Sequence, residues 1–131
     1  MNFIAILVSA AVNMLIGALW YSPLLFAKPW MALNNMTPDS MKNVNPGPLY
    51  AQSFVATLVA YFVLAMAIIA VNATTAFDGV KTAFWIWLGF ITTVQFTANV
   101  FSPKKIQAYF IDTGYQLVSI LIAGAILAAW R

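Results

Sequence analysis

The chain contains no cysteine and no histidine, and all three of its acidic residues are aspartate. Without thiols or imidazoles there is no disulfide, no cysteine nucleophile and no imidazole base, and the usual ligands of transition metals and haem are missing. We therefore expect no catalytic site, no metal site and no resident cofactor. A quinone or another lipid held between helices is still compatible with such a sequence.

Charged residues are also few. Charged residues make up 7% of the chain and hydrophobic residues 63%, whereas a soluble domain has about 25% charged residues. The charges leave four apolar stretches, at residues 1–27, 43–77, 82–103 and 113–130. Each stretch holds a segment of about 18–25 residues, enough for a helix to cross a bilayer. The sequence thus predicts an all-α integral membrane protein, a single domain over residues 1–131.

The backbone must satisfy its own hydrogen bonds in lipid, so we expect the spans to be helical. The predicted four-helix transmembrane bundle has helices at about 3–21, 49–71, 79–101 and 103–130. Asp78 is a suitable N-cap for the third helix, and Ser102 with Pro103 suits the start of the fourth. The first helix has no basic residue in front of it, so we expect it to be retained rather than cleaved as a signal peptide.

The segment 22–48 between the first two helices has an unusual composition. It contains five prolines, at positions 23, 29, 38, 46 and 48, which exclude one long regular helix. It is also too apolar for a solvated linker, with leucines, methionines, a phenylalanine and a tryptophan. We predict short amphipathic helices that lie in the membrane interface.

An even number of crossings places both chain ends on one side of the membrane. Four lysines, Lys28, Lys42, Lys104 and Lys105, fall on the opposite side, while Lys81 and Arg131 fall with the ends. The positive-inside rule then predicts that loops 22–48 and 102–105 are cytoplasmic and that the termini lie outside, in a cell (inner) membrane. The net charge of +3 is too small and scattered to indicate nucleic acid, but suits contact with anionic membrane lipids.

Aromatic residues gather near the predicted helix ends, where rings favour the headgroup level. On this basis tryptophans such as Trp20, Trp85, Trp87 and Trp130 are interpreted as anchors. The predicted half nearest the termini is instead rich in alanine and glycine, which suit close contact between helices.

Polar residues within the spans define the candidate site, because polar groups in lipid normally face the bundle interior. We predict an intramembrane polar cluster made of Asn13, Gln95, Asn99, Asp112 and Gln116. At 1.5 Å per residue, Asn13, Gln95 and Asp112 lie about 9–12 Å from the lysine-rich side, so they are expected to meet at one level. For Asn13 and Gln95 the alternative is a purely structural hydrogen bond between helices, worth about 0.6 kcal/mol each.

Asp112 is the only acidic residue within a predicted span. If it lies in lipid, its carboxylate is a candidate site for taking up and releasing protons. Alternatively, the fourth helix extends beyond the membrane, because residues 113–130 alone measure about 27 Å and nearly span it. The sequence leaves both interpretations open.

A segment at the end of the first helix forms what we call the interfacial elbow. Gly17 permits close approach of a neighbouring helix, while Trp20 and Tyr21 are expected to seat the helix end at the headgroups. Ser22 and Pro23 end the helix. Four residues apart in the following segment, Phe26 and Trp30 share one face and are expected to dip into the acyl boundary.

The elbow sequence Gly17-Ala18-Leu19-Trp20-Tyr21-Ser22-Pro23 is also the basis of a resemblance. A second stretch comprises Trp87-Leu88-Gly89-Phe90, then Gly114-Tyr115, Gly124 and Trp130. Over nearly the whole chain, these residues resemble a family of small bacterial membrane proteins catalogued as domain of unknown function 1761. The resemblance implies a multi-pass inner-membrane protein and supplies no activity. The family often has Asn at the position of Asp112, which argues against an obligatory proton carrier there.

Two functional hypotheses follow. The first is a non-enzymatic subunit that associates with itself or with another membrane protein. The alternative is a small proton-coupled or small-molecule transporter that acts as an oligomer, with Asp112 as the coupling carboxylate and Asn13, Gln95 and Gln116 lining the pathway. An enzyme is disfavoured, because it would rely on Asp112 with Tyr109 or Tyr115 and has no evident nucleophile.

Overall fold

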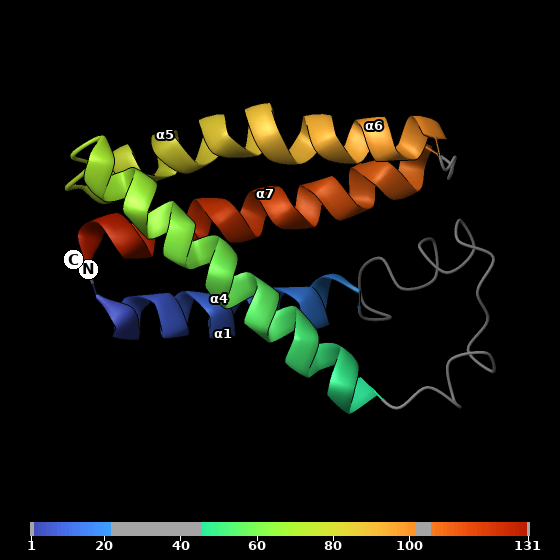
Figure 1. The fold of residues 1–131 in the computed structure, drawn as a ribbon, viewed down its shortest axis with the longest axis horizontal. Coiled ribbons are helices and arrows are strands. Elements are labelled where there is room, and N and C mark those ends of the chain that lie inside the picture. Colours follow the sequence, from blue (N-terminus) through green and yellow to red (C-terminus); the bar gives the residue numbers. More distant parts are fainter. Residues whose placement is uncertain (1, 22–45, 102–105, 131) are drawn as a thin grey trace.

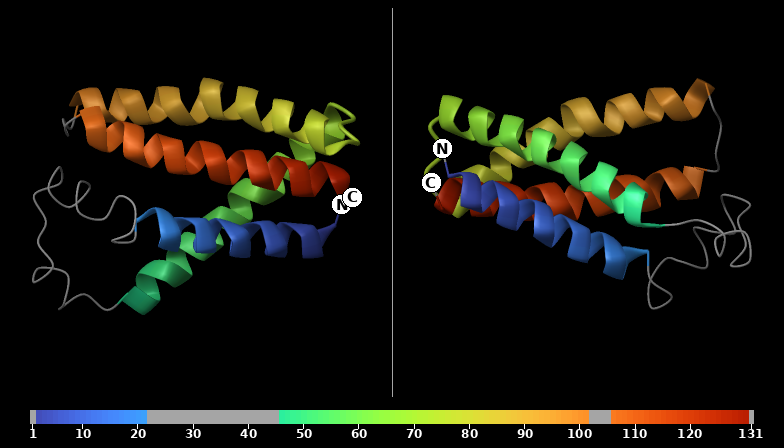
Figure 2. Two further views of the ribbon diagram at one scale, coloured as in Figure 1. Left: turned by 180° about the vertical axis from the view of Figure 1, so that it is seen from behind. Right: turned by 60° about the horizontal axis from the view of Figure 1, so that its bottom comes forward.

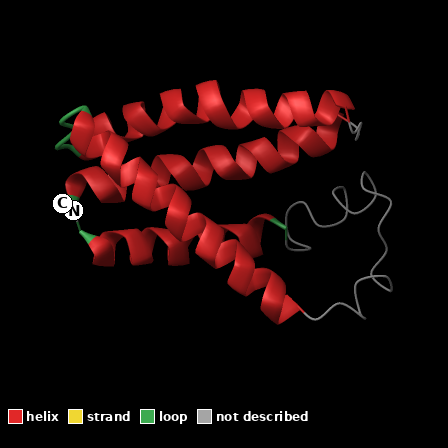
Figure 3. Ribbon diagram, viewed as in Figure 1, coloured by secondary structure: helices red, strands yellow, loops and turns green. Residues whose placement is uncertain are grey.

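The computed structural model describes residues 2–21, 46–101 and 106–130 (Figure 1). All regular structure in these ranges is helical. The elements are α1 (Phe3–Trp20), α4 (Pro46–Ala70), α5 (Ala76–Ile86), the π-helix η1 (Trp87–Thr92), α6 (Thr93–Phe101) and α7 (Ile106–Ala129). Short loops separate α4 from α5, and α5, η1 and α6 follow one another without a break (Figure 3).

The described ranges contain four helical segments that are long and apolar enough to cross a membrane. The third is the continuous rod of α5, η1 and α6, of 26 residues from Ala76 to Phe101. This confirms the prediction of an all-helical fold with four helical segments long and apolar enough to span a membrane. The predicted interfacial helices fall on residues 22–45, which lie outside the described residues, as do Ser102 and Pro103.

The start of α4 differs from the prediction. The helix begins at Pro46 and not near residue 49, so Pro46 and Pro48 belong to its first turn rather than to the interfacial segment. Proline is tolerated there because the first N–H groups of a helix have no partner within the helix in any case.

The helices form a layer with one helix lying across it. The rod of α5 to α6 and helix α1 pack on opposite sides of α7, and α4 crosses this layer diagonally (Figures 1 and 2). Helix α7 contacts every other span, so it is the central helix of the bundle.

The two chain ends meet at one end of the bundle (Figure 1). The side chain of Asn2 caps α1, because its Oδ1 accepts from the N–H groups of Ile4 and Ala5 at 3.0 and 3.2 Å. Its Nδ2 donates to the carbonyl oxygen of Trp130 at 3.2 Å. Both ends of the chain therefore lie at the same end of the bundle, as an even number of crossings requires. We call this end the termini end, and the opposite end, where α1 stops and α4 starts, the long-loop end.

The turn between α4 and α5 has well-defined caps. Asn72 has a φ of 58°, and the N–H groups of Asn72 and Ala73 donate to the carbonyls of Ile69 and Ile68, both at 3.0 Å. This is a Schellman ending, in which asparagine tolerates the left-handed conformation.

The N-cap of α5 corrects a prediction. Thr75, in an extended conformation, is the N-cap, and its Oγ1 accepts from the N–H of Asp78 at 3.1 Å. Asp78, predicted to be the cap, instead lies in the first turn and pairs with Lys81 at 3.6 Å. A hydroxyl three residues ahead of an acidic residue satisfies the same N–H groups, so the helix starts one turn earlier.

The apolar core lies in the half of the bundle nearest the termini end, which we call the termini half. Helices α5 and α7 touch there through Gly79 and Ala83 on one side and Gly124 and Ala128 on the other. A Cβ at Gly79 would collide with the backbone oxygen of Gly124, so these helices are in backbone contact. The predicted close packing through small residues is confirmed in this half.

Candidate functional site

The other half, which we call the long-loop half, is organised around Asn13 of α1. Its Oδ1 accepts from the hydroxyl of Tyr115 at 2.9 Å and from that of Tyr61 at 3.3 Å. Its Nδ2 lies 3.3 Å from Oγ1 of Thr57, and that hydroxyl donates to the carbonyl of Ser53 at 2.8 Å. One asparagine thus joins α1, α4 and α7, and it is only 9% exposed.

A second polar contact joins α6 to α7. Gln95 Nε2 donates to Gln116 Oε1 at 2.5 Å, and both side chains are half-buried. These two residues were placed in one predicted cluster, and here their side chains bond to each other. The predicted cluster is therefore not one network. Asn13 bonds to two tyrosines and a threonine, whereas Gln95 bonds to Gln116.

These polar groups line a cavity of about 1020 Å³. Its floor is α7, with Tyr115, Gln116, Ser119 and Ile120. Its walls are α1 and α4 on one side and the rod from Ile86 to Gln95 on the other. None of the described residues that line the cavity is charged.

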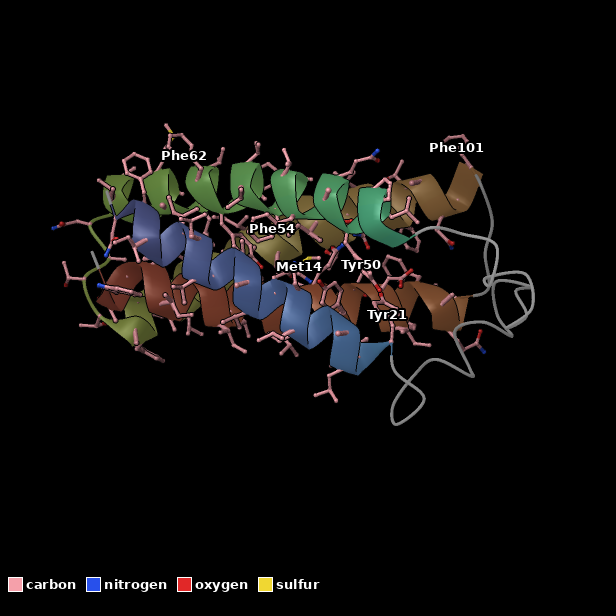
Figure 4. All side chains as sticks on the ribbon, turned by 90° about the horizontal axis from the view of Figure 1, so that it is seen from below. Met14, Tyr21, Tyr50, Phe54, Phe62 and Phe101 are labelled. Carbon is pink, nitrogen blue, oxygen red and sulfur yellow. The ribbon has the colours of Figure 1, made fainter. Side chains whose placement is uncertain are left out.

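The cavity has a polar and an apolar part. Towards the long-loop end it is lined by Tyr21, Tyr50 and Ser53, and Met14, Tyr21 and Tyr50 lie near one another there (Figure 4). Towards the termini end its lining is apolar and includes Val63, Leu64, Ala67 and Ile86. The cavity is therefore polar at one end and apolar at the other, as an amphiphilic molecule is.

The cavity is open on one side. Helices α4 and α6 diverge towards the long-loop end, because α4 runs diagonally (Figure 1). Val59 on α4 and Val94 on α6 both line the cavity, yet they are 61% and 64% exposed. The opening therefore faces the side of the bundle, where the bilayer lies when the helices span it.

Asp112 of α7 is not a lining residue of this cavity, and it lies level with the end of α1. The hydroxyl of Tyr21 donates to Asp112 Oδ1 at 2.5 Å, and Trp20 Nε1 donates to the carbonyl of Ile111 at 3.0 Å. Asp112 is half-buried and is not among the lining residues. The pair places this carboxylate level with the last turn of α1, closer to the long-loop end than Asn13.

Glycines shape the contact between α1 and α7. A Cβ at Gly17 would lie 3.0 Å from the hydroxyl oxygen of Tyr115, and one at Gly114 would lie 3.3 Å from the ring of Trp20. Each helix therefore offers a glycine to an aromatic ring of the other. The expected role of Gly17 in close approach is confirmed, and its neighbour is the ring of Tyr115.

The other predicted site residues do not join this group. Asn99 lies about one turn of α6 beyond Gln95, is half-buried, and does not line the cavity. Ser22, Pro23, Phe26 and Trp30 of the elbow lie outside the described residues. Trp20 and Tyr21 are described, and both direct their polar atoms at α7.

Three features were not anticipated from the sequence. Tyr115 was considered only as an enzymatic partner of Asp112, but it is part of the cavity floor and bonds to Asn13. Trp87 was interpreted as a headgroup anchor, but its Nε1 donates to the carbonyl of Thr113 at 3.0 Å. The third feature is η1 itself, which precedes Gln95 on the cavity wall.

The π-helix leaves carbonyl groups that need partners. The hydroxyls of Thr92 and Thr93 donate to the carbonyls of Leu88 and Gly89, each at 2.7 Å. The hydroxyl of Tyr109 donates to the carbonyl of Thr92 at 2.8 Å. Wide turns of this kind recur at functional sites, because they re-aim the side chains that follow.

The fold and the site together define a class: a small helical protein whose four helical segments, each long and apolar enough to cross a membrane, surround a cavity that opens sideways. The chain belongs to the family described as Protein of unknown function (DUF1761), whose model matches residues 4–128. The resemblance noted in the sequence is thereby confirmed. No curated protein and no solved structure matches the chain.

Proposed function

We propose that this protein is a non-enzymatic membrane subunit that binds or carries an uncharged lipophilic molecule in its cavity. The observation that carries this proposal is the cavity of about 1020 Å³ with amide and phenol groups at one part and aliphatic side chains at the other. Ligand sites are typically pockets of about 300–1000 Å³ that are mostly apolar with a few placed polar groups.

The lining chemistry favours binding over catalysis. Its polar groups are two glutamines, an asparagine, hydroxyls and phenols. Asn13 and Tyr115 bond to each other, and so do Gln95 and Gln116, so none of them is paired with a base that would activate a nucleophile.

A variant that fills the cavity tests this proposal. Ala60 lines the cavity and is exposed, so Ala60→Phe places a ring in the cavity without disturbing a packed contact. Ala51 is also an exposed residue of α4 but does not line the cavity, which makes Ala51→Phe the matched control. Native mass spectrometry of protein purified in mild detergent reports what each variant retains.

We expect the unmodified protein and Ala51→Phe to carry the same small lipophilic molecule and Ala60→Phe to lose it. Equal retention by both variants would show that the cavity is not the binding site.

The proton-coupled transporter hypothesis receives less support from the geometry. Asp112 is not itself a lining residue, and its carboxylate is bonded to the hydroxyl of Tyr21, which lines the cavity at the level where α1 ends. We propose that its role is to hold α1 against α7. Asp112→Asn keeps an acceptor oxygen for Tyr21, so proton flux in proteoliposomes should match that of the unmodified protein, and a loss of flux would restore the coupling role.

Self-association is a second candidate property. In the most apolar stretch of the α5–η1–α6 rod no residue is buried within one copy, against 33% in α7. Phe90, 71% exposed, and Phe96, 50% exposed, extend from this rod. We propose that a second copy packs on this surface, with membrane lipid or another membrane protein as the remaining neighbours. Single-molecule subunit counting in nanodiscs should give two copies, and only monomers would exclude the proposal.

The orientation in the membrane is proposed from the lysine distribution. The chain has no cysteine, so single cysteines can be introduced cleanly. With a membrane-impermeant maleimide on whole cells, Thr74→Cys at the termini end should be labelled and Ser40→Cys should be protected. The reverse pattern would place the lysine-rich loops outside.

A further inference from the structure

Gln95 and Gln116, which both line the cavity, have amide groups that can form further hydrogen bonds. Gln95 Nε2 donates to Gln116 Oε1, and among the described residues neither Gln95 Oε1 nor the protons of Gln116 Nε2 have a hydrogen-bond partner. If both amide groups were flipped by 180°, one carbonyl oxygen and one NH₂ group would still be without a partner. The pair therefore presents one acceptor and one donor side by side.

We infer that the cavity selects a long-chain molecule whose uncharged head carries a hydroxyl group. A hydroxyl donates one hydrogen bond and accepts others, so it can satisfy Gln95 Oε1 and Gln116 Nε2 at the same time. This inference rests on the proposed function and names the class of ligand for the same cavity.

Charged amphiphiles do not fit the lining. Among the described residues that line the cavity none is charged, so an ammonium or a carboxylate head bound among them would be desolvated without a counter-ion. The cost of an unpaired charge in lipid is large compared with one hydrogen bond. A purely apolar molecule is also a poor match, because it would cover both glutamine groups and leave them without partners.

The distribution of apolar lining fixes how the chain of the ligand lies. From Gln95 and Gln116 towards the termini end, the cavity is bordered by aliphatic residues such as Val63 and Ile86. The head then lies at the glutamines and the hydrocarbon chain points towards the termini end, as in a lipid of the leaflet at the long-loop end. The exposed valines Val59 and Val94 mark the side from which such a molecule enters directly from the bilayer.

Oleyl alcohol and oleyl methyl ether test the inference, since they share the chain and differ in the O–H donor. Oleylamine is the charged probe. Competition against tritiated oleyl alcohol is measured with the protein in phosphatidylcholine nanodiscs. The informative variant is Gln95→Leu/Gln116→Leu, and Gln52→Leu, an exposed residue of α4 outside the cavity, is the matched control.

We expect the unmodified protein and Gln52→Leu to prefer the alcohol to the ether by about ten-fold, as one net hydrogen bond allows. The double leucine variant should bind both equally, and oleylamine should compete weakly in all cases. Because the comparison is between variants, differences in bilayer partitioning of the probes cancel.

Two failures are distinguishable. If alcohol and ether bind equally to the unmodified protein but Ala60→Phe abolishes both, the cavity binds lipophiles and the hydroxyl selection is wrong. If Ala60→Phe leaves the binding of both probes unchanged, the cavity is not the site and the proposed function falls with the inference.

Discussion

In the termini half the helices touch through glycine and alanine, whereas in the long-loop half they are joined by hydrogen bonds between side chains. Gly79 and Gly124 bring the backbones of α5 and α7 into contact. In the other half, Asn13 and the Gln95–Gln116 pair bridge helices that stand further apart around a cavity.

The difference shows two solutions to one problem. Lipid is as apolar as the helices, so association needs close packing or polar contacts. Close packing fills space and leaves no room for a ligand, while polar side chains span a gap and keep it open. The termini half thus contains the closest helix packing, and the long-loop half contains the polar part of the cavity.

The largest effect is expected where backbones touch. Gly79→Ala places a Cβ against the backbone of Gly124 and against Ala128 Cβ, so α5 must move away from α7. We expect the free energy of unfolding to fall by about 2–3 kcal/mol, as for other overpacked contacts. Reversible unfolding in mixed detergent micelles measures it.

Gly89→Ala is the matched control, because a Cβ at Gly89 meets nothing within 4 Å. Its unfolding free energy should lie within about 0.5 kcal/mol of the unmodified protein. Equal losses for both alanine variants would refute the explanation by contact, because alanine has the higher helix propensity and by itself favours the helix.

A smaller effect is expected at the centre of the polar network. Asn13→Leu leaves the hydroxyl of Tyr61 without its acceptor, while that of Tyr115 keeps only the backbone carbonyl of residue 13, at 3.2 Å. We expect a loss of about 1–2 kcal/mol, because unsatisfied polar groups are costly in the bundle interior. The triple variant with Tyr61→Phe and Tyr115→Phe should recover much of this loss, and a triple variant less stable than Asn13→Leu would refute the polar account.

The contact between Tyr21 and Asp112 should contribute less again. Tyr21→Phe removes the donor to the carboxylate and should lower the unfolding free energy by about 0.5–1.5 kcal/mol. Asp112→Asn keeps an acceptor oxygen and should have the milder effect. If the asparagine variant is the less stable of the two, the charge of Asp112 stabilises the protein through another contact.

The smallest effect is expected for a hydroxyl that bonds within its own helix. Thr97 is exposed and donates to the carbonyl of Thr93 at 3.0 Å. Thr97→Val should change the unfolding free energy by less than about 0.5 kcal/mol. A larger loss in micelles that hold two copies, but not in those that hold one, would place Thr97 in the contact between copies.

Hydropathy alone predicts the four spans, because a lipid-spanning helix is specified locally by length and composition. Helix faces were also predictable, so Asn13, Gln95 and Gln116 were correctly placed on the inside. The partners of Asn13 on α4, Thr57 and Tyr61, were not predictable, because they depend on the diagonal crossing of α4, which no local pattern encodes. The same limit applies to Gly79. The sequence contains both Gly79 and Gly124, 45 positions later, but does not show that the two are in contact.

Two local details were missed for different reasons. Thr75 and Asp78 are both good N-caps, and the choice between them is decided by which residue is extended in the turn after Asn72. The π-helix η1 has no marker such as proline, and it becomes apparent only through its extra carbonyl contacts with Thr92, Thr93 and Tyr109.

The hydrogen bond between Asn2 and the carbonyl of Trp130 brings the two ends of the chain next to each other. A short peptide that joins the two ends would therefore turn the protein into a cyclic polypeptide with every helix in place. New ends could then be opened at the turn around Asn72, so that α5 becomes the first helix and α4 the last. The order of synthesis and insertion would change while the cavity and its neighbours stay the same.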